Sequence, residues 1–203
     1  MFASSRQLGR IPVLAVTGES GSGKTVFLNR LLKLPELART VVLTTTGENK
    51  AHFEHDRVIL LPETDFVSDS GCLCCDMRSA LGDTLRDLFL KALSKRIEPI
   101  DRVVIETPVL DPSQLKFTLR HAPFLGQRYV YQATLFVVDA AKAVDQGVSP
   151  QERAAMSHAD KLVLAKNDLV GSEDLIRLKD DLLKSHPDIQ MVMSNEPSQV
   201  LKP

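Results

Sequence analysis

Short, wholly apolar runs alternate with longer amphipathic stretches along this chain. The first run, residues 11–17, has the length and apolar content of a buried strand. Strands that are apolar throughout occur where helices cover both faces of a sheet, so the pattern predicts a mostly parallel sheet. Six further runs predict strands at 40–45, 57–61, 102–105, 134–138, 161–165 and 190–193.

Helical periodicity marks the stretches between these runs. Residues 24–34 repeat phenylalanine and leucine at helical spacing, and residues 78–96 carry a leucine-rich stripe that we interpret as core packing. A helix is also predicted at 172–185, where a serine stands at the N-cap and acidic residues follow in the first turn. We expect residues 145–150 to form a loop.

Length and charge limit the classes of protein to consider. The chain has 203 residues, the size of one α/β domain, and a net charge of −1, which provides no field to attract nucleic acid or an anionic membrane. It has no apolar run long enough to cross a membrane, and the polar lead at 1–10 is not a secretory signal. We therefore expect a cytoplasmic protein with one domain at 11–195 and a loose tail at 196–203.

Residues 18–25 have the sequence G-E-S-G-S-G-K-T, which fits the phosphate-loop pattern G-x-x-x-x-G-K-[ST] in full. The glycines let backbone N–H groups turn inward around phosphates, and the following helix directs its dipole at the same anion. A chance glycine-rich turn is the alternative, which the strand before the loop and the helix after it disfavour. The predicted fold class is α/β, a P-loop NTPase three-layer sandwich with a mostly parallel central sheet. The predicted nucleotide ligands are Gly18, Glu19, Ser20, Gly21, Ser22, Gly23, Lys24, which reaches the β- and γ-phosphates, and Thr25, which holds Mg²⁺.

Three cysteines gather in the segment G-C-L-C-C-D at 71–76. In an extended chain Cys72 and Cys74 point to one side and Cys75 to the other, so a bend is needed to bring all three to one ion. Thiolates select Zn²⁺, Cu(I) or similar ions over Mg²⁺, and three ligands leave an open fourth position that suits a metal which is passed on. Three buried cysteines used as small hydrophobic residues, or a redox sensor, are the alternatives.

Three later segments complete an ordered set of motifs. V-V-I-E-T at 103–107, V-V-D-A at 137–140 and A-K-N-D at 165–168 follow the cysteine segment. Together with the phosphate loop they resemble the CobW-type GTPases, relatives of the urease and hydrogenase nickel-insertion GTPases. The resemblance runs from about residue 11 to residue 194, and few other families carry G-C-x-C-C between a phosphate loop and such a strand.

This resemblance implies a metallochaperone that couples GTP hydrolysis to delivery of zinc or cobalt to a client metalloprotein. It places GTP or GDP and Mg²⁺ at the phosphate loop, with Glu106 facing the Mg²⁺ shell. Asp168 can accept hydrogen bonds from guanine N1–H and N2–H₂, a pair that adenine does not offer, although a helix-capping aspartate is the alternative. The implied site residues are Lys24, Thr25 and Glu106 for catalysis, Lys166, Asn167 and Asp168 for the base, and Cys72, Cys74 and Cys75 for the thiophilic metal.

The sequence also departs from the family pattern. Ala165 stands where the guanine motif begins with asparagine, which predicts a weaker guanine preference. The family's E-T-S-G-L-A-D-P is E-T-P-V-L-D-P at 106–112, and Pro108 has no N–H to offer the γ-phosphate. T-T-T-G-E at 44–48 lacks the first acid of the family's N-E-x-G-E, so we expect weak hydrolysis. The second, C-terminal domain common in the family does not follow, which predicts a short form or a GTPase domain cut from a longer protein.

Other interpretations stay open. A non-hydrolysing or weakly hydrolysing module could hold GTP or metal as a regulatory signal, and the altered segment after Glu106 favours it. A small-molecule kinase is disfavoured because no arginine-rich lid is found. His52, Glu54, His55 and Asp56 could complete the metal shell, although a solvated loop is the simpler interpretation. A nucleotide-dependent homodimer is a further expectation.

Overall fold

The structure is a computed structural model that describes residues 9–44, 52–61, 80–106 and 112–201. Its strands are β1 (Ile11–Thr17), β2 (Thr40–Thr44), β3 (Val58–Leu60), β4 (Arg102–Glu106), β5 (Tyr129–Asp139), β6 (Lys161–Ala165) and β7 (Gln190–Met193). They form one seven-stranded sheet in the order β3-β2-β4-β1-β5-β6-β7, and every neighbouring pair is parallel. This sheet confirms the predicted α/β class.

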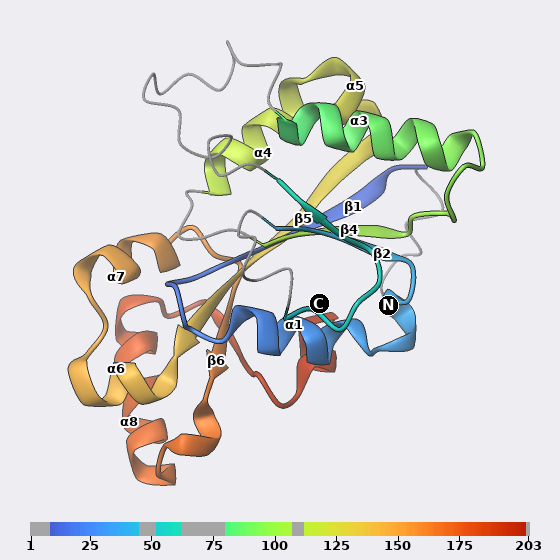
Figure 1. The fold of residues 1–203 in the computed structure, drawn as a ribbon. Coiled ribbons are helices and arrows are strands. Elements are labelled where there is room, and N and C mark those ends of the chain that lie inside the picture. The colour runs from blue at the N-terminus through green and yellow to red at the C-terminus, as the bar shows by residue number, and fades with distance from the viewer. Residues whose placement is uncertain (1–8, 45–51, 62–79, 107–111, 202–203) are drawn as a thin grey trace.

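Helices connect the strands and cover both faces of the sheet. They are α1 (Lys24–Leu32), α3 (Ala80–Leu93), α4 (Pro112–His121), α5 (Pro123–Arg128), α6 (Ala140–Gln146), α7 (Pro150–Met156) and α8 (Ser172–Ser185), with short 3-10 helices η2 (Pro35–Leu37), η4 (Asn167–Leu169) and η5 (Pro197–Leu201). In Figure 1, α3, α4 and α5 lie on one side of the sheet and α1 on the other. No helix in the described ranges is long and apolar enough to span a bilayer.

Alternating side chains of the central strand divide the core into two layers. Val13 belongs to the apolar cluster around α3, whereas its neighbour Leu14 belongs to the cluster around α1. A third cluster joins Phe136 of β5 to Leu182 of α8. Apolar side chains therefore pack on both faces of the sheet, and the loops at its edge are attached to well-packed strands.

Four helices and part of one strand differ from the sequence prediction. Strand β5 begins at Tyr129, well before the predicted residue 134, because its first half, which contains two tyrosines and a glutamine, also pairs with β1. Helices α4, α5, α6 and α7 were not predicted, since each is short and only partly apolar. The predicted loop at 145–150 shrinks to three residues, 147–149, between α6 and α7. Ser149 and Glu152 form a capping box that begins α7, a signal present in the sequence.

The expectation of a loose tail is wrong for η5. Val200 is 6% exposed and joins the apolar cluster of α1, and its carbonyl oxygen accepts a hydrogen bond of 3.2 Å from Lys161 Nζ. One buried apolar side chain packs this segment against the fold. Because the residues around Val200 are mostly polar, the sequence shows no apolar pattern that would predict this contact.

Candidate nucleotide site

The phosphate loop lies at the carboxyl end of β1, between the ends of β4 and β5, and leads directly into α1 (Figure 1). The carboxyl edge of a parallel sheet is where ligands bind in this class of fold. Gly18 has a φ of 143°, and a Cβ on it would lie 2.4 Å from the backbone oxygen of Val137. Glycine is therefore required here by both conformation and space.

Lys24 folds back over this loop. Its side chain is buried, and Nζ donates hydrogen bonds of 2.9 Å to Gly18 O and 2.7 Å to Glu19 O. Burial lowers the pKa of Lys24, while the carboxylates of Glu106 and Glu19 act in the opposite direction. The ammonium thus lies against the first two residues of the loop, and a bound phosphate would replace the two carbonyl oxygens as its partner.

The other predicted loop ligands take different positions. Ser20 and Gly21 are exposed, and Gly21 and Gly23 have positive φ values of 75° and 97°. Ser22 is buried, and its Oγ has no hydrogen-bond partner among the residues that the structure describes. A loop that turns its backbone in this way and keeps a hydroxyl unpaired matches the needs of a bound phosphate.

Three oxygen-bearing side chains meet beside Lys24. Thr25 Oγ1 donates to Glu106 Oε1 at 3.3 Å, and Thr44 Oγ1 donates to Glu106 Oε2 at 2.6 Å. Glu106 is only 1% exposed at the end of β4. Hydroxyl and carboxylate oxygens are the ligands that Mg²⁺ prefers, so Thr25 and Glu106 fit this ion. The structure brings together the three residues predicted for catalysis, and it adds Thr44, which the sequence analysis did not select.

The predicted base-binding segment follows β6 at the same edge. Lys166 adopts a positive φ of 54°, and its ammonium forms an ion pair with Asp139. Asn167 Oδ1 accepts a hydrogen bond of 3.3 Å from Ser194 Oγ, and Asp168 is exposed. The segment is therefore held in place by Lys166 and Asn167, and it leaves the carboxylate of Asp168 open to a ligand.

Asp139 links the base-binding segment to α6. Its carboxylate caps the helix by accepting a hydrogen bond of 3.0 Å from the Lys142 amide, and it also pairs with Lys166. Burial alone would raise the pKa of Asp139, but the hydrogen bonds from Lys142 N and Lys166 Nζ outweigh it and hold the pKa below its ordinary value. Asp139 therefore stays ionised at neutral pH.

Two residues that the sequence analysis did not select also make contacts at this site. Lys142 of α6 forms an ion pair with Glu19 of the phosphate loop, and Ser194 follows β7. Neither belongs to a recognised motif, so no local signal could have found them. Ala165, the departure from the guanine motif, lies against the loop, because a Cβ on Gly23 would be 3.2 Å from Ala165 Cβ.

The predicted thiophilic site lies outside the described residues, since Cys72, Cys74 and Cys75 fall within 62–79. In the described ranges no group of three or more His, Cys, Asp or Glu side chains is arranged to hold a metal ion. His55 Nε2 lies 2.7 Å from Thr40 O, and Glu54 pairs with Lys33 at 2.8 Å. These contacts favour the simpler interpretation of that polar loop.

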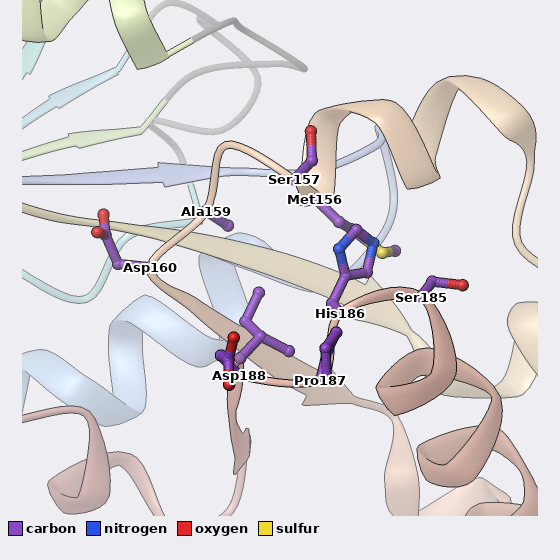
Figure 2. A pocket seen from close by; sticks show the side chains of 9 residues that line it. Met156, Ser157, Ala159, Asp160, Ser185, His186, Pro187 and Asp188 are labelled. Atoms are coloured by element: carbon purple, nitrogen blue, oxygen red, sulfur yellow. The ribbon is translucent and has the colours of Figure 1, made fainter.

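A separate pocket opens at the opposite, amino-terminal edge of the sheet. It has a volume of about 310 Å³ and lies where β6 and β7 begin. Figure 2 shows the imidazole of His186 beside the side chain of Met156, with Asp160 and Asp188 farther along the wall. None of the predicted nucleotide ligands lines this pocket.

Comparison with known proteins agrees with this geometry. The family description "CobW/HypB/UreG, nucleotide-binding domain" matches residues 12–193. The chain is 28% identical over 189 residues to the "Zinc-regulated GTPase metalloprotein activator 1" of Schizosaccharomyces pombe, an alignment that covers 87% of this chain and 44% of that protein. The chain thus spans less than half the length of this relative.

Solved structures show the same fold. Zn(II)-bound YjiA GTPase from E. coli superposes with a TM-score of 0.60 at 24% identity, over 86% of this chain and 54% of that one. HypB from Helicobacter pylori in complex with nickel gives a TM-score of 0.54 at 18% identity, over 97% of this chain and 85% of that one. At these identities the likeness speaks for the fold alone. The family match extends over most of the chain, and this chain belongs to the CobW/HypB/UreG nucleotide-binding domain family.

Proposed function

We propose that this chain is the GTP-hydrolysing domain of a metallochaperone, which couples its nucleotide state to binding and transfer of zinc or cobalt to a client metalloprotein. The single observation that carries the proposal is the contact of Thr25 with the buried carboxylate of Glu106, next to Lys24 on the phosphate loop. Glu106 is 1% exposed and presents its carboxylate beside the hydroxyl groups of Thr25 and Thr44, and oxygen ligands of this kind suit Mg²⁺.

The phosphate side of the proposal rests on donors that can change partners. Lys24 gives up the carbonyl oxygens of Gly18 and Glu19 and donates to the β- and γ-phosphates instead. Thr25 and Glu106 would hold Mg²⁺, which would supply charge stabilisation to the transferred phosphoryl group. Thr44 keeps Glu106 oriented through its hydrogen bond of 2.6 Å.

The base side of the proposal rests on a preorganised segment. Asp139 at the end of β5 pairs with Lys166, and Ser194 after β7 donates a hydrogen bond to Asn167. The two residues that follow β6 are therefore held in place before a nucleotide binds. Asp168 is exposed and accepts hydrogen bonds from guanine N1–H and N2–H₂. Buried Ala165 supplies no polar group here, which predicts a smaller preference for GTP over ATP than an asparagine would give.

The metal side of the proposal rests on the sequence and on the relatives. Cys72, Cys74 and Cys75 offer three soft ligands for zinc or cobalt as cargo. The curated relative is named as a zinc-regulated activator of metalloproteins, which supports zinc as the first ion to test. Linkage requires that metal and nucleotide change each other's affinity by the same factor.

A non-hydrolysing regulatory module is the second candidate. Residues 107–109, which directly follow Glu106, are Thr-Pro-Val, and a proline at 108 has no N–H to donate to a γ-phosphate. In this alternative the same site binds GTP and metal, but turnover is absent.

Phosphate release at saturating GTP, measured with and without Zn²⁺, separates the two candidates. We expect turnover that Zn²⁺ alters, a loss of about 100-fold in Glu106→Gln, and turnover without any zinc response in the triple variant Cys72→Ser, Cys74→Ser, Cys75→Ser. Tight GTP binding without phosphate release would establish the regulatory module. Faster release from ATP than from GTP would remove the guanine assignment of Asp168.

A further inference from the structure

The phosphate loop carries an acidic side chain that a second element neutralises. Glu19 lies between Gly18 and the rest of the loop, and its carboxylate forms an ion pair with Lys142 of α6. The two side chains are 31% and 41% exposed, so the pair is partly shielded from water. An anionic side chain on a loop that binds an anion is unfavourable unless something offsets its charge.

The field of Glu19 reaches the phosphate position. Lys24 Nζ donates a hydrogen bond of 2.7 Å to the backbone oxygen of Glu19, so the two residues are in contact. Burial lowers the pKa of Lys24, and the carboxylates of Glu106 and Glu19 offset part of that effect. Because Lys24 is the group that contacts the β- and γ-phosphates, a charge that attracts its ammonium also repels the phosphates bound to it. The repulsion grows with the number of phosphate charges.

Lys142 is well placed to cancel this repulsion. The hydrogen bond that the Lys142 ammonium donates to the Glu19 carboxylate is the main factor that raises the pKa of Lys142. The carboxylates of Glu152 and Asp139 act in the same direction, so the lysine is charged at neutral pH. Its backbone is also fixed, because its amide donates to the capping carboxylate of Asp139 at 3.0 Å. The ammonium is therefore delivered to the loop from a helix anchored to β5.

We propose that Lys142 is a positioning residue that offsets the charge of Glu19 and thereby sets the preference of the site for a triphosphate over a diphosphate. This inference rests on the proposed nucleotide function. GTP carries one more negative charge than GDP near the loop, so an uncompensated Glu19 penalises GTP more than GDP. Lys142 removes that penalty without contacting the base.

The alternative is that Lys142 only supports the local structure. Helix α6 packs against η4, which contains Asn167 and Asp168, so loosening α6 would disturb the base-binding segment. A disturbance of that kind weakens GTP and GDP binding equally, because both ligands carry the same base. It is also independent of whether residue 19 carries a charge.

Titration with fluorescently labelled GDP and a labelled non-hydrolysable GTP analogue, both with Mg²⁺, tests the inference. The proteins are wild type, Lys142→Met, Glu19→Gln and the double variant, with Lys142→Arg as the charge-conserving variant. Lys91→Met is the matched control, because Lys91 pairs with Asp87 on the exposed face of α3 at 2.7 Å, away from the loop. Urea unfolding of each variant reports whether the fold is intact.

We expect Lys142→Met to lower the affinity for the GTP analogue roughly tenfold and the affinity for GDP about threefold. The difference between the two losses should shrink at high salt. The affinities of the double variant for both nucleotides should lie within about twofold of those of Glu19→Gln. The affinities of Lys142→Arg and Lys91→Met should stay near those of wild type. Equal losses for the two nucleotides, or no rescue by Glu19→Gln, would overturn the role of Lys142. If wild type binds neither nucleotide, the proposed function itself fails together with this inference.

Discussion

The two edges of the sheet hold their acidic side chains in different ways. At the amino-terminal edge, Asp160 accepts hydrogen bonds from the Thr134 amide at 2.7 Å and from the Tyr131 hydroxyl at 2.9 Å. At the carboxyl edge, Glu106 accepts from the side chains of Thr25 and Thr44. A backbone amide in a strand cannot leave its acceptor, whereas a side-chain hydroxyl can rotate toward a ligand.

This contrast separates a polar cluster that joins two strands from the cluster that we propose binds a ligand. Asp160 is 44% exposed at its side chain, and its contacts tie the start of β6 to β5. Glu106 is 1% exposed and lies beside a lysine whose partners are loop carbonyls. Both donors to Glu106 are hydroxyl groups that can turn toward a ligand, so we expect this cluster to respond to a bound nucleotide.

Removal of Lys24 should give the largest effect. Lys24→Ala takes away the ammonium that contacts Gly18 and Glu19 of the phosphate loop, and we expect GTP affinity to fall about 100-fold or more. Isothermal titration with GTP and Mg²⁺ measures the loss. Asp160→Ala at the other edge is the matched control and should bind GTP like wild type, so a similar loss in both variants would break the distinction between the edges.

Next in size is the effect of a methyl group at the start of the loop. Gly18→Ala forces a Cβ to within 2.4 Å of Val137 O and imposes a φ that alanine avoids. We expect the free energy of unfolding to fall by about 1–3 kcal/mol. Urea unfolding checks this, and Gly147→Ala, which also has a positive φ but open space around it, separates conformational strain from the clash.

Asp160→Ala should show a smaller effect, and on stability alone. The substitution leaves the Thr134 amide without its acceptor, which should cost about 1–2 kcal/mol in urea unfolding. Tyr131→Phe removes the hydroxyl that also donates to Asp160 and should cost less. A change in GTP affinity in either variant would argue that the amino-terminal edge takes part in the nucleotide site.

The smallest expected effect concerns pH. Asp139 has a lowered pKa in the folded protein, so its ionised form contributes stability that is present above its unfolded pKa of about 3.9 and is lost as the pH falls through the folded value. Asp139→Asn keeps the helix cap but loses the charge, and we expect a deficit of about 0.5–1 kcal/mol at pH 7. In urea unfolding this deficit should begin to shrink below about pH 4 and close once the pH is below the lowered folded pKa. A deficit that persists there would mean that shape, not charge, is responsible.

The sequence predicted the parts of this molecule whose signals are local. The strand at 11–17, the phosphate loop and α1 follow one another within a short segment, and their spacing alone identified them. Helices α6 and α7 escaped because they are short, although the capping box of Ser149 and Glu152 was visible. Local patterns therefore located the elements but missed the shortest of them.

Contacts between distant residues could not be predicted in the same way. Thr44 and Glu106 are 62 positions apart, and Glu19 and Lys142 are 123 positions apart. Such pairs depend on the strand order, which places β4 between β2 and β1 and β5 on the other side of β1. The family resemblance pointed to Glu106, but only the fold showed which side chains orient it.

The most direct test of the account is a zinc competition titration with a chromophoric chelator, run on the nucleotide-free protein, with GDP and with a non-hydrolysable GTP analogue. We predict that zinc affinity differs between the GDP and GTP-analogue states, and that the triple serine variant of Cys72, Cys74 and Cys75 loses zinc binding in all three. The same zinc affinity in every nucleotide state, or zinc binding unchanged by removal of the three thiols, would contradict the coupling of nucleotide and metal.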